Sequence, residues 1–210
     1  MSLQQLGVLT LLLLSATAIA VAPLAMPEGY SWISNAISES AAQGQERAWV
    51  ARLGFLLYGF AVLWLVVLAH GRWGRWGSFF LRTFGVMMLS TAAFSHKPWQ
   101  TGVAYDAFED LLHSITATGM GLAFAIGVVA VSIRRGDRWE GARVLDVLAV
   151  GASFILPLGM SAWPAVGGAL QRLLFLIAYI WYASETVSRV PAGSPIRSST
   201  DPPPLAWGIS

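Results

Sequence analysis

Six apolar runs constrain the fold of this chain more than any other feature of its sequence. A helix needs about 20 apolar residues to cross the roughly 30 Å hydrocarbon layer of a membrane. Runs of this kind occupy residues 6–26, 50–69, 78–94, 111–133, 144–163 and 169–187. The sequence therefore predicts an all-α integral membrane protein in which residues 1–190 form a bundle of six transmembrane helices.

The composition supports this class and excludes others. Apolar residues make up 56% of the chain and charged residues 11%, whereas about a quarter of the residues in soluble domains are charged. The net charge of +2 is too small to indicate a nucleic-acid-binding protein, so we expect the lipid bilayer to be the main partner. The chain has no cysteine, which excludes disulfides, thiolate metal sites and cysteine nucleophiles.

The basic residues indicate which way the runs cross the membrane, because cytoplasmic loops are enriched in lysine and arginine. Arginines gather after the second run, between the fourth and fifth runs and after the last, at Arg72, Arg75, Arg134, Arg135, Arg138, Arg143, Arg189 and Arg197. Most acidic residues outside the runs lie instead in residues 28–47 and 95–110. We therefore expect both termini in the cytoplasm and these two acidic loops on the extracytoplasmic side.

The two ends of the chain need separate interpretation. The first run ends in small residues, as a cleavable signal peptide does, but residues 1–7 have no basic residue to form the positive start of such a peptide. We expect this run to be retained as a membrane span. Residues 191–210 are rich in proline and serine, so we expect a disordered cytoplasmic tail.

Four polar side chains open the fourth run at spacings of three and four residues: Asp106, Glu109, Asp110 and His113. Such spacings place them on one stripe of a helix, with Asp110 and His113 facing the bundle together. A carboxylate beside an imidazole can orient the ring, raise its basicity or share a metal ion with it. The alternative is an acidic helix start, because carboxylates stabilise the positive end of the helix dipole.

Further polar residues lie on the same predicted side. His96 follows the third run, and Arg172 enters the sixth, where we expect it to pair with one of the outer carboxylates: Asp110, Glu109 or Glu39. The loop after the first run predicts a short amphipathic or re-entrant helix, whose polar face would hold Ser31, Ser34, Asn35 and Ser38. The alternative for this loop is an interfacial segment that only connects two spans.

One acidic residue lies at the opposite, cytoplasmic end of the predicted bundle. Asp146 begins the fifth run, close in sequence to Arg143 and Arg138. We expect it to form an ion pair with one of these arginines and to have no functional role.

Three short stretches, taken together, resemble one family. They are the Tyr-Ser-Trp-Ile-Ser-Asn-Ala-Ile-Ser-Glu loop at residues 30–39 with Arg52-Leu53-Gly54-Phe55 after it, Phe94 leading to Leu112-His113, and Gly168-Ala169-Leu170-Gln171-Arg172-Leu173. In order and spacing they are similar to a family of bacterial and archaeal multi-pass membrane proteins, catalogued as domain of unknown function 998. The resemblance implies a six-helix fold in a bacterial inner membrane, and it implies no activity.

Two non-transport functions are open for the extracytoplasmic polar cluster. The one we favour is structural or partner-binding, in which the polar residues fix helix packing within the chain, with another membrane protein or in a homo-oligomer. The other is an outer-leaflet, lipid-directed hydrolase, with Ser38 or Ser34 as nucleophile and His113 as a base oriented by Asp110. No cofactor is established, but His96, His113 and Asp110 could supply the three protein ligands that a catalytic zinc needs.

The third function is binding or transport of a small molecule or a lipid headgroup. Ionisable residues within membrane spans often mark such sites. The residues would be Arg172, Glu39, Glu109, Ser34 and Asn35. Against transport, no run shows the paired glycine or proline breaks of transporters built from repeats.

Overall fold

The computed structural model describes residues 1–136 and 143–188, and every regular element in this part of the chain is a helix. The predicted tail at residues 191–210 lies outside the described residues. The elements, in order, are α1 (Leu3–Val21), η1 (Ala22–Ala25), α2 (Ile37–Ser40), α3 (Trp49–Ala93), α4 (Ala107–Arg135), α5 (Val144–Ala162), η3 (Pro164–Val166) and α6 (Gly167–Val187).

Five of these helices are long and apolar enough to cross a membrane: α1 with η1, α3, α4, α5, and α6 with η3. The predicted all-helical, multi-pass class is therefore confirmed. The limits of the individual spans remain a prediction.

The longest helix, α3, folds back on itself. A straight helix of its 45 residues would be about 68 Å long, roughly twice the thickness of the hydrocarbon layer. The chain reverses at Gly74, whose backbone has φ +67° and ψ −179°, a conformation that glycine adopts without strain. The two arms of α3, before and after Gly74, pack against each other where Leu89 covers Gly59 and Leu63 covers Gly85.

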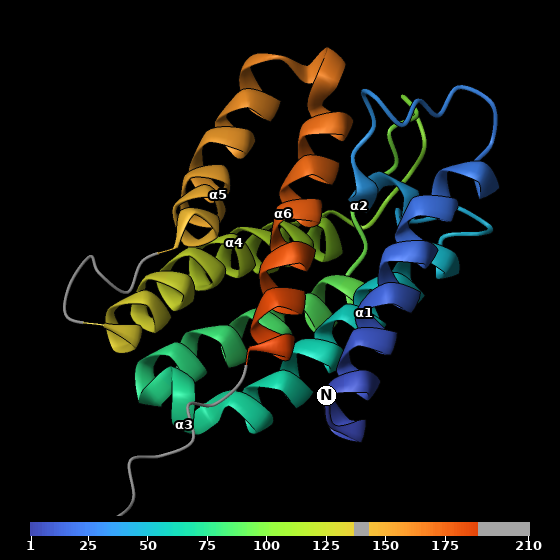
Figure 1. Ribbon diagram of the computed structural model, residues 1–210. Coiled ribbons are helices and arrows are strands. Elements are labelled where there is room, and N and C mark those ends of the chain that lie inside the picture. Colours follow the sequence, from blue (N-terminus) through green and yellow to red (C-terminus); the bar gives the residue numbers. More distant parts are fainter. Residues whose placement is uncertain (137–142, 189–210) are drawn as a thin grey trace, which may run out of the picture.

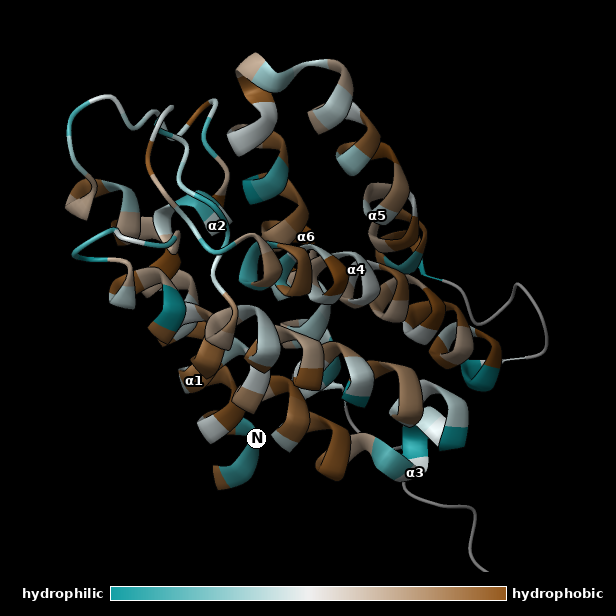
Figure 2. Cartoon of the chain, turned by 180° about the vertical axis from the view of Figure 1, so that it is seen from behind, coloured by the Kyte–Doolittle hydropathy of each residue, from teal (hydrophilic) through white to brown (hydrophobic). Residues whose placement is uncertain are grey.

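The elements give the bundle two ends (Figure 1). At one end lie residues 26–48 (the first loop), residues 94–106 (the second loop) and the link between α5 and α6; we call it the loop end. At the other lie the N-terminus of α1, the bend of α3, the end of α4, the start of α5 and the end of α6. This second end carries Arg72, Arg75, Arg134, Arg135 and Arg143, and we call it the arginine end. Figure 2 shows hydrophilic residues concentrated at the two ends and hydrophobic ones along the helices between them.

The centre of the bundle is an aromatic core. Tyr58 of α3 stacks on Tyr179 of α6 with ring centroids 4.2 Å apart, and its ring also contacts Phe84 and Tyr182. The N-terminal helix joins this core because Ser15 of α1 hydrogen-bonds the Tyr179 hydroxyl at 2.5 Å and the Gly54 carbonyl at 2.6 Å. Helix α1 is thus packed as an integral part of the bundle. Helix α5 lies at the edge, against α6 and α4, and leaves Ile155 and Leu158 about 70% exposed (68% and 71%).

The loop after α1 differs from the predicted amphipathic helix. Only Ile37–Ser40 is helical. Its apolar residue Ile37 and its polar residues Ser38 and Ser40 are all buried, so the short helix has no separate exposed polar face. Trp32 and Ile33, two apolar residues of this loop, are exposed. The physical reason is that the Asn35 side chain accepts a hydrogen bond from the backbone N–H of Ser31 at 2.8 Å, a local bond that competes with helix formation.

Candidate functional site

Arg172 holds the first loop to the start of α6. Its Nη1 donates to the carbonyls of Trp32 (2.7 Å), Asn35 (2.9 Å) and Gly168 (3.0 Å), and its Nη2 donates to the Tyr30 hydroxyl (2.9 Å). The predicted pairing of Arg172 with a carboxylate is therefore wrong. Backbone carbonyls satisfy the guanidinium instead, because the irregular loop turns several of them toward α6.

Tyr30 connects the guanidinium to the rest of the loop. Its hydroxyl accepts from Arg172 and donates to the carbonyl of Ala36 at 3.0 Å. Burial raises the pKa of Tyr30 above its usual value, although the neighbouring Arg172 acts in the opposite direction. The hydroxyl therefore stays protonated at neutral pH and can keep both bonds.

The same loop lies directly on the first turn of α6. The backbone N–H groups of Gly168 and Ala169 donate to the carbonyls of Ser34 (3.1 Å) and Ile33 (2.9 Å). The N–H groups at a helix start have no partner within the helix, so the loop carbonyls satisfy them. A Cβ on Gly168 would come within 2.2 Å of the Asn35 oxygen, and only glycine permits this approach.

The start of α4 holds the second loop through the opposite kind of hydrogen bond, in which side-chain carboxylates accept from backbone N–H groups. Glu109 accepts from the N–H of Ser95 at 2.6 Å, and Asp110 accepts from the N–H of Lys97 at 2.8 Å. Asp106 is the N-cap of α4 and accepts from its first N–H groups. For Asp106 the acidic helix start, which was our alternative interpretation, is the observed one.

The two histidines, His96 and His113, meet at the loop end. Their rings stack with centroids 5.2 Å apart. We predicted that Asp110 orients His113. Asp110 contacts His96 instead, with the Asp110 Oδ1 and the His96 Nδ1 2.5 Å apart. His113 is buried, and its Nδ1 lies 2.8 Å from the carbonyl of Phe94.

The predicted zinc site finds no support. No group of three or more His, Cys, Asp or Glu side chains within residues 1–136 and 143–188 is arranged to hold a metal ion. The physical reason lies in the contacts just described. His96 and Asp110 face each other, and the Nδ1 of His113 faces a backbone carbonyl.

One glutamine joins the two loops. The Gln43 side chain accepts from the N–H of Asp106 at 2.7 Å and donates to the carbonyls of Asp106 (3.0 Å) and Ser95 (3.1 Å). Its backbone N–H donates to the carbonyl of His96 at 2.9 Å. We had not singled out Gln43, because a lone glutamine in a polar loop has no distinguishing signal in the sequence.

The remaining predicted site residues lie within the first loop. Glu39 accepts from the N–H of Ala36 at 2.5 Å and from the Asn35 side chain at 3.3 Å, which closes the turn before α2. Ser38 is 9% exposed, and Ser34 contributes its carbonyl to α6 while its side chain is exposed. The roles predicted for these residues in catalysis or ligand binding remain predictions.

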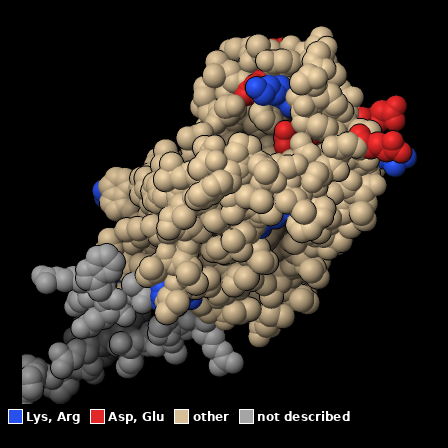
Figure 3. Space-filling view, turned by 90° about the horizontal axis from the view of Figure 1, so that it is seen from above, with Lys and Arg blue, Asp and Glu red and all other residues tan. Residues whose placement is uncertain are grey.

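A hollow of about 280 Å³ opens at the loop end, but it lies apart from these residues. Its lining is formed by residues 25–27 and 44–47, which include none of the predicted site residues. Figure 3, a view from above onto this end, shows the visible acidic side chains gathered over one part of the surface, with basic side chains both among them and at separate places on an otherwise uncharged surface.

The arginine end contains a second polar cluster, which is more deeply buried. Glu185 of α6 is 1% exposed and binds three arginines: Arg143 at 2.6 Å, Arg135 at 2.8 Å and Arg72 at 3.3 Å. Its carboxylate also accepts from the indole N–H of Trp73 at 2.7 Å. A carboxylate without such partners would be costly to bury, so these contacts explain its position.

Asp146 belongs to the same cluster. It pairs with Arg143 at 3.2 Å, as predicted, and also with Arg135 at 2.5 Å, and it accepts from the Trp181 indole at 2.7 Å. Arg138, the other predicted partner, lies outside the described residues. We missed Glu185 and the two tryptophans. The sequence did contain a signal for Glu185, because this carboxylate lies near the end of the sixth apolar run, on the same predicted side as the arginine-rich loops.

Comparison with known proteins gives a family and nothing more specific. The sequence matches the family described as "Protein of unknown function (DUF998)" over residues 9–187. No curated protein and no solved structure matches the chain. The family match includes both loops of the loop end and both carboxylates of the arginine end. Because it covers most of the 210 residues and agrees with the resemblance found in the sequence, the chain belongs to the DUF998 family.

Proposed function

We propose that this protein is a structural, non-catalytic component of a bacterial inner membrane, with six transmembrane helices and both termini in the cytoplasm. In this proposal the loop end is extracytoplasmic. Its polar residues fix the two loops on the helix starts, and the resulting rigid surface is available to a membrane-protein partner or a second copy of the chain.

The proposal rests on the hydrogen bonds that Arg172 makes. Among the described residues its guanidinium donates four hydrogen bonds within the protein, three to carbonyls and one to the Tyr30 hydroxyl. Glu109 and Asp110 likewise bind backbone N–H groups of the second loop. A binding or catalytic cluster would direct such groups toward a substrate, whereas a structural cluster satisfies them internally.

The topology is supported by two features. The reversal of α3 at Gly74 turns one long helix into two antiparallel arms, each long enough to cross a membrane. Arginines are concentrated at the end where the α3 bend, the N-terminus of α1 and the end of α6 lie (Figure 1). The positive-inside rule then favours a cytoplasmic position for that end.

Transport is less well supported than a structural role. A hollow in the middle of the bundle, between Tyr58 and Phe84 of α3, Met120 of α4, Ser153 of α5 and Leu174 of α6, has a volume of about 30 Å³. That is about the space of one water molecule. A solute path at this level would need the helices to separate.

A second candidate is an outer-leaflet hydrolase, and one observation favours it. Asp110 holds the Nδ1 of His96 at 2.5 Å, the arrangement in which a carboxylate orients an imidazole that acts as a general base. In this version His96 takes the role that we predicted for His113, and Ser38 remains the predicted nucleophile.

Purified protein in detergent can separate the two candidates. We would compare wild type, Arg172→Gln, His96→Ala and His113→Ala for thermal unfolding, zinc content and hydrolysis of phospholipid esters. The structural proposal expects the largest fall in unfolding midpoint for Arg172→Gln, with no stoichiometric zinc and no ester hydrolysis. Hydrolysis by wild type that is lost in His96→Ala, or zinc that is lost in His113→Ala, would overturn it in favour of the enzyme. Reporter fusions at both termini test the topology.

A further inference from the structure

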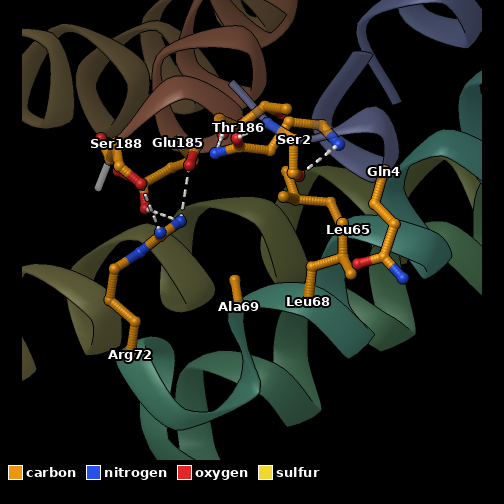
Figure 4. A pocket seen from close by; sticks show the side chains of 10 residues that line it. Ser2, Gln4, Leu65, Leu68, Ala69, Arg72, Glu185, Thr186 and Ser188 are labelled. Atoms are coloured by element: carbon orange, nitrogen blue, oxygen red, sulfur yellow. Dashed lines mark hydrogen bonds and ion pairs between the residues drawn. The ribbon is translucent and has the colours of Figure 1, made fainter. Parts of the chain in front are cut away.

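The arginine end contains a hollow of about 250 Å³ between three helix ends (Figure 4). The start of α1, the first arm of α3 and the end of α6 line it, through Ser2, Gln4, Gln5, Leu65, Leu68, Ala69, Arg72, Glu185, Thr186 and Ser188. One wall is apolar, and the others carry an arginine, a glutamate, amides and hydroxyls. Such a hollow suits an amphipathic molecule with a polar group at the level of the helix ends.

Arg72 gives the hollow its charge. The guanidinium donates to the carbonyls of Ser188 (2.9 Å) and Glu185 (2.6 Å) and to the Glu185 carboxylate (3.3 Å). These bonds use three of the five N–H donors of an arginine. The Nε–H is buried and has no hydrogen-bond partner among the described residues.

The positive charge of Arg72 is only partly balanced. Glu185 lies closer to Arg143 (2.6 Å) and Arg135 (2.8 Å) than to Arg72 (3.3 Å), and Asp146 also binds Arg143 and Arg135, so two carboxylates serve three guanidinium groups. Arg72 is the one of the three that lines the hollow. The Glu185 carboxylate also lines the hollow and repels an anion, but the described cluster of three guanidinium groups and two carboxylates carries a net charge of +1, which favours an anion there.

Neutral donors face the same space. The Gln4 side chain is exposed and lines the hollow on the side opposite Arg72 (Figure 4). The Ser2 hydroxyl accepts from the N–H of Gln5 at 3.2 Å and keeps its own O–H to donate. Leu65, Leu68 and Ala69 supply the apolar wall below them.

We propose that this hollow binds a negatively charged phosphate group, with Arg72 as the cationic ligand and Gln4 and Ser2 as neutral donors. Guanidinium groups and hydroxyls are common phosphate ligands because they donate to its several oxygens. The phosphate belongs either to the headgroup of an anionic lipid, whose chains would follow the apolar wall, or to a soluble phosphate compound. The site is independent of the role proposed for the loop end.

Native mass spectrometry of the detergent-purified chain tests this site. Phosphatidylglycerol and phosphatidylcholine with identical acyl chains would be added at equal concentration, and adducts counted. One basic residue near an anionic membrane surface contributes about fivefold in binding, so we expect about fivefold preference for phosphatidylglycerol. Arg72→Gln should remove the preference. Arg75→Gln is the matched control, since Arg75 is three residues away, exposed, and outside the hollow.

Gln4 provides variants that leave the ion pairs of Arg72 intact. Gln4→Glu should weaken the preference and Gln4→Lys should strengthen it, even if Arg72→Gln does not fold. A second arm measures thermal unfolding with inorganic phosphate against chloride at equal ionic strength. Stabilisation by phosphate that Arg72→Gln abolishes, without lipid preference, identifies a soluble phosphate ligand and supports the site. Equal adducts of the two lipids in wild type and in all three variants, together with no Arg72-dependent stabilisation by phosphate, would overturn the proposal. An equal loss of the lipid preference in Arg75→Gln would overturn it as well.

Discussion

The loop end and the arginine end are held by opposite kinds of contact. At the loop end, charged side chains bind the backbone: Arg172 binds carbonyls, and Glu109 and Asp110 bind N–H groups. At the arginine end, charged side chains bind mainly one another, with Asp146 and Glu185 between three arginines, although Arg72 also binds two backbone carbonyls. The first arrangement orders irregular loops, and the second fixes regular helices.

The difference has an energetic consequence. The carboxylates at the arginine end are 3% and 1% exposed, whereas the His96–Asp110 pair at the loop end has side chains 24% and 18% exposed. Removing one member of a buried charge cluster leaves the others unpaired at low dielectric. Contacts at the solvent-exposed edge can be replaced by water. The four predictions below test this gradient, beginning with the largest effect.

Glu185→Gln should be the most destabilising single change. It removes the carboxylate shared by Arg72, Arg135 and Arg143 and leaves Asp146, which binds Arg135 and Arg143, as the remaining carboxylate of the described cluster. We expect the free energy of unfolding to fall by about 3–5 kcal/mol, measured as a lower thermal midpoint in detergent. Glu46→Gln, at an exposed position of the loop end, is the control and should change little. A similar effect of both variants would end the distinction between the two ends.

Gly168→Ala tests the contact between the first loop and α6. The added Cβ would lie 2.2 Å from the Asn35 oxygen, so the loop must move away from the helix start. Overpacking of this kind costs about 1–3 kcal/mol, and protease cleavage within residues 29–40 should become faster. Gly121→Ala has open space around its Cβ and should show neither effect. An unchanged cleavage rate in Gly168→Ala would mean that the loop is not held by this contact.

Arg172→Lys separates charge from geometry at the loop end. Lysine keeps the positive charge but cannot reach Tyr30, Trp32 and Asn35 with the planar set of donors that arginine provides. Loss of one charge-assisted hydrogen bond should lower the free energy of unfolding by about 1.5 kcal/mol. The matched control is Arg75→Lys at the arginine end, where the guanidinium stacks on Trp76. If Arg172→Lys is as stable as wild type, charge alone holds the loop.

The sequence predicts the helices well because apolar runs respond directly to the membrane, and it predicts the Asp146–Arg143 pair because the two residues are three apart. It does not reveal the partners of Arg172. Every residue type carries the same backbone carbonyl, so a group that binds carbonyls has no complementary residue to search for. The sequence does contain carboxylates that could pair with Arg172, and their presence led to the wrong prediction.

The two histidines and Asp110 illustrate a different limit. Their common side follows from the topology, and the structure places their rings in contact. Which imidazole Asp110 binds depends on the path of residues 94–97, whose backbone is fixed by Glu109 and Gln43 from two other segments. Contacts that depend on several distant segments at once cannot be obtained from helical spacing within one of them.

His96→Ala should have the smallest effect of the four. The imidazole is partly exposed and binds Asp110 through a single contact of 2.5 Å, while Asp110 keeps its bond to the N–H of Lys97. We therefore expect a loss of less than about 1 kcal/mol, with His70→Ala, at an exposed position of α3, as control. Asp110→Asn should cost more than His96→Ala, because it weakens both contacts. If His96→Ala instead matches Glu185→Gln, the His96–Asp110 pair supports the bundle as strongly as the buried arginine cluster does. The burial gradient between the two ends would then be the wrong explanation of their stability.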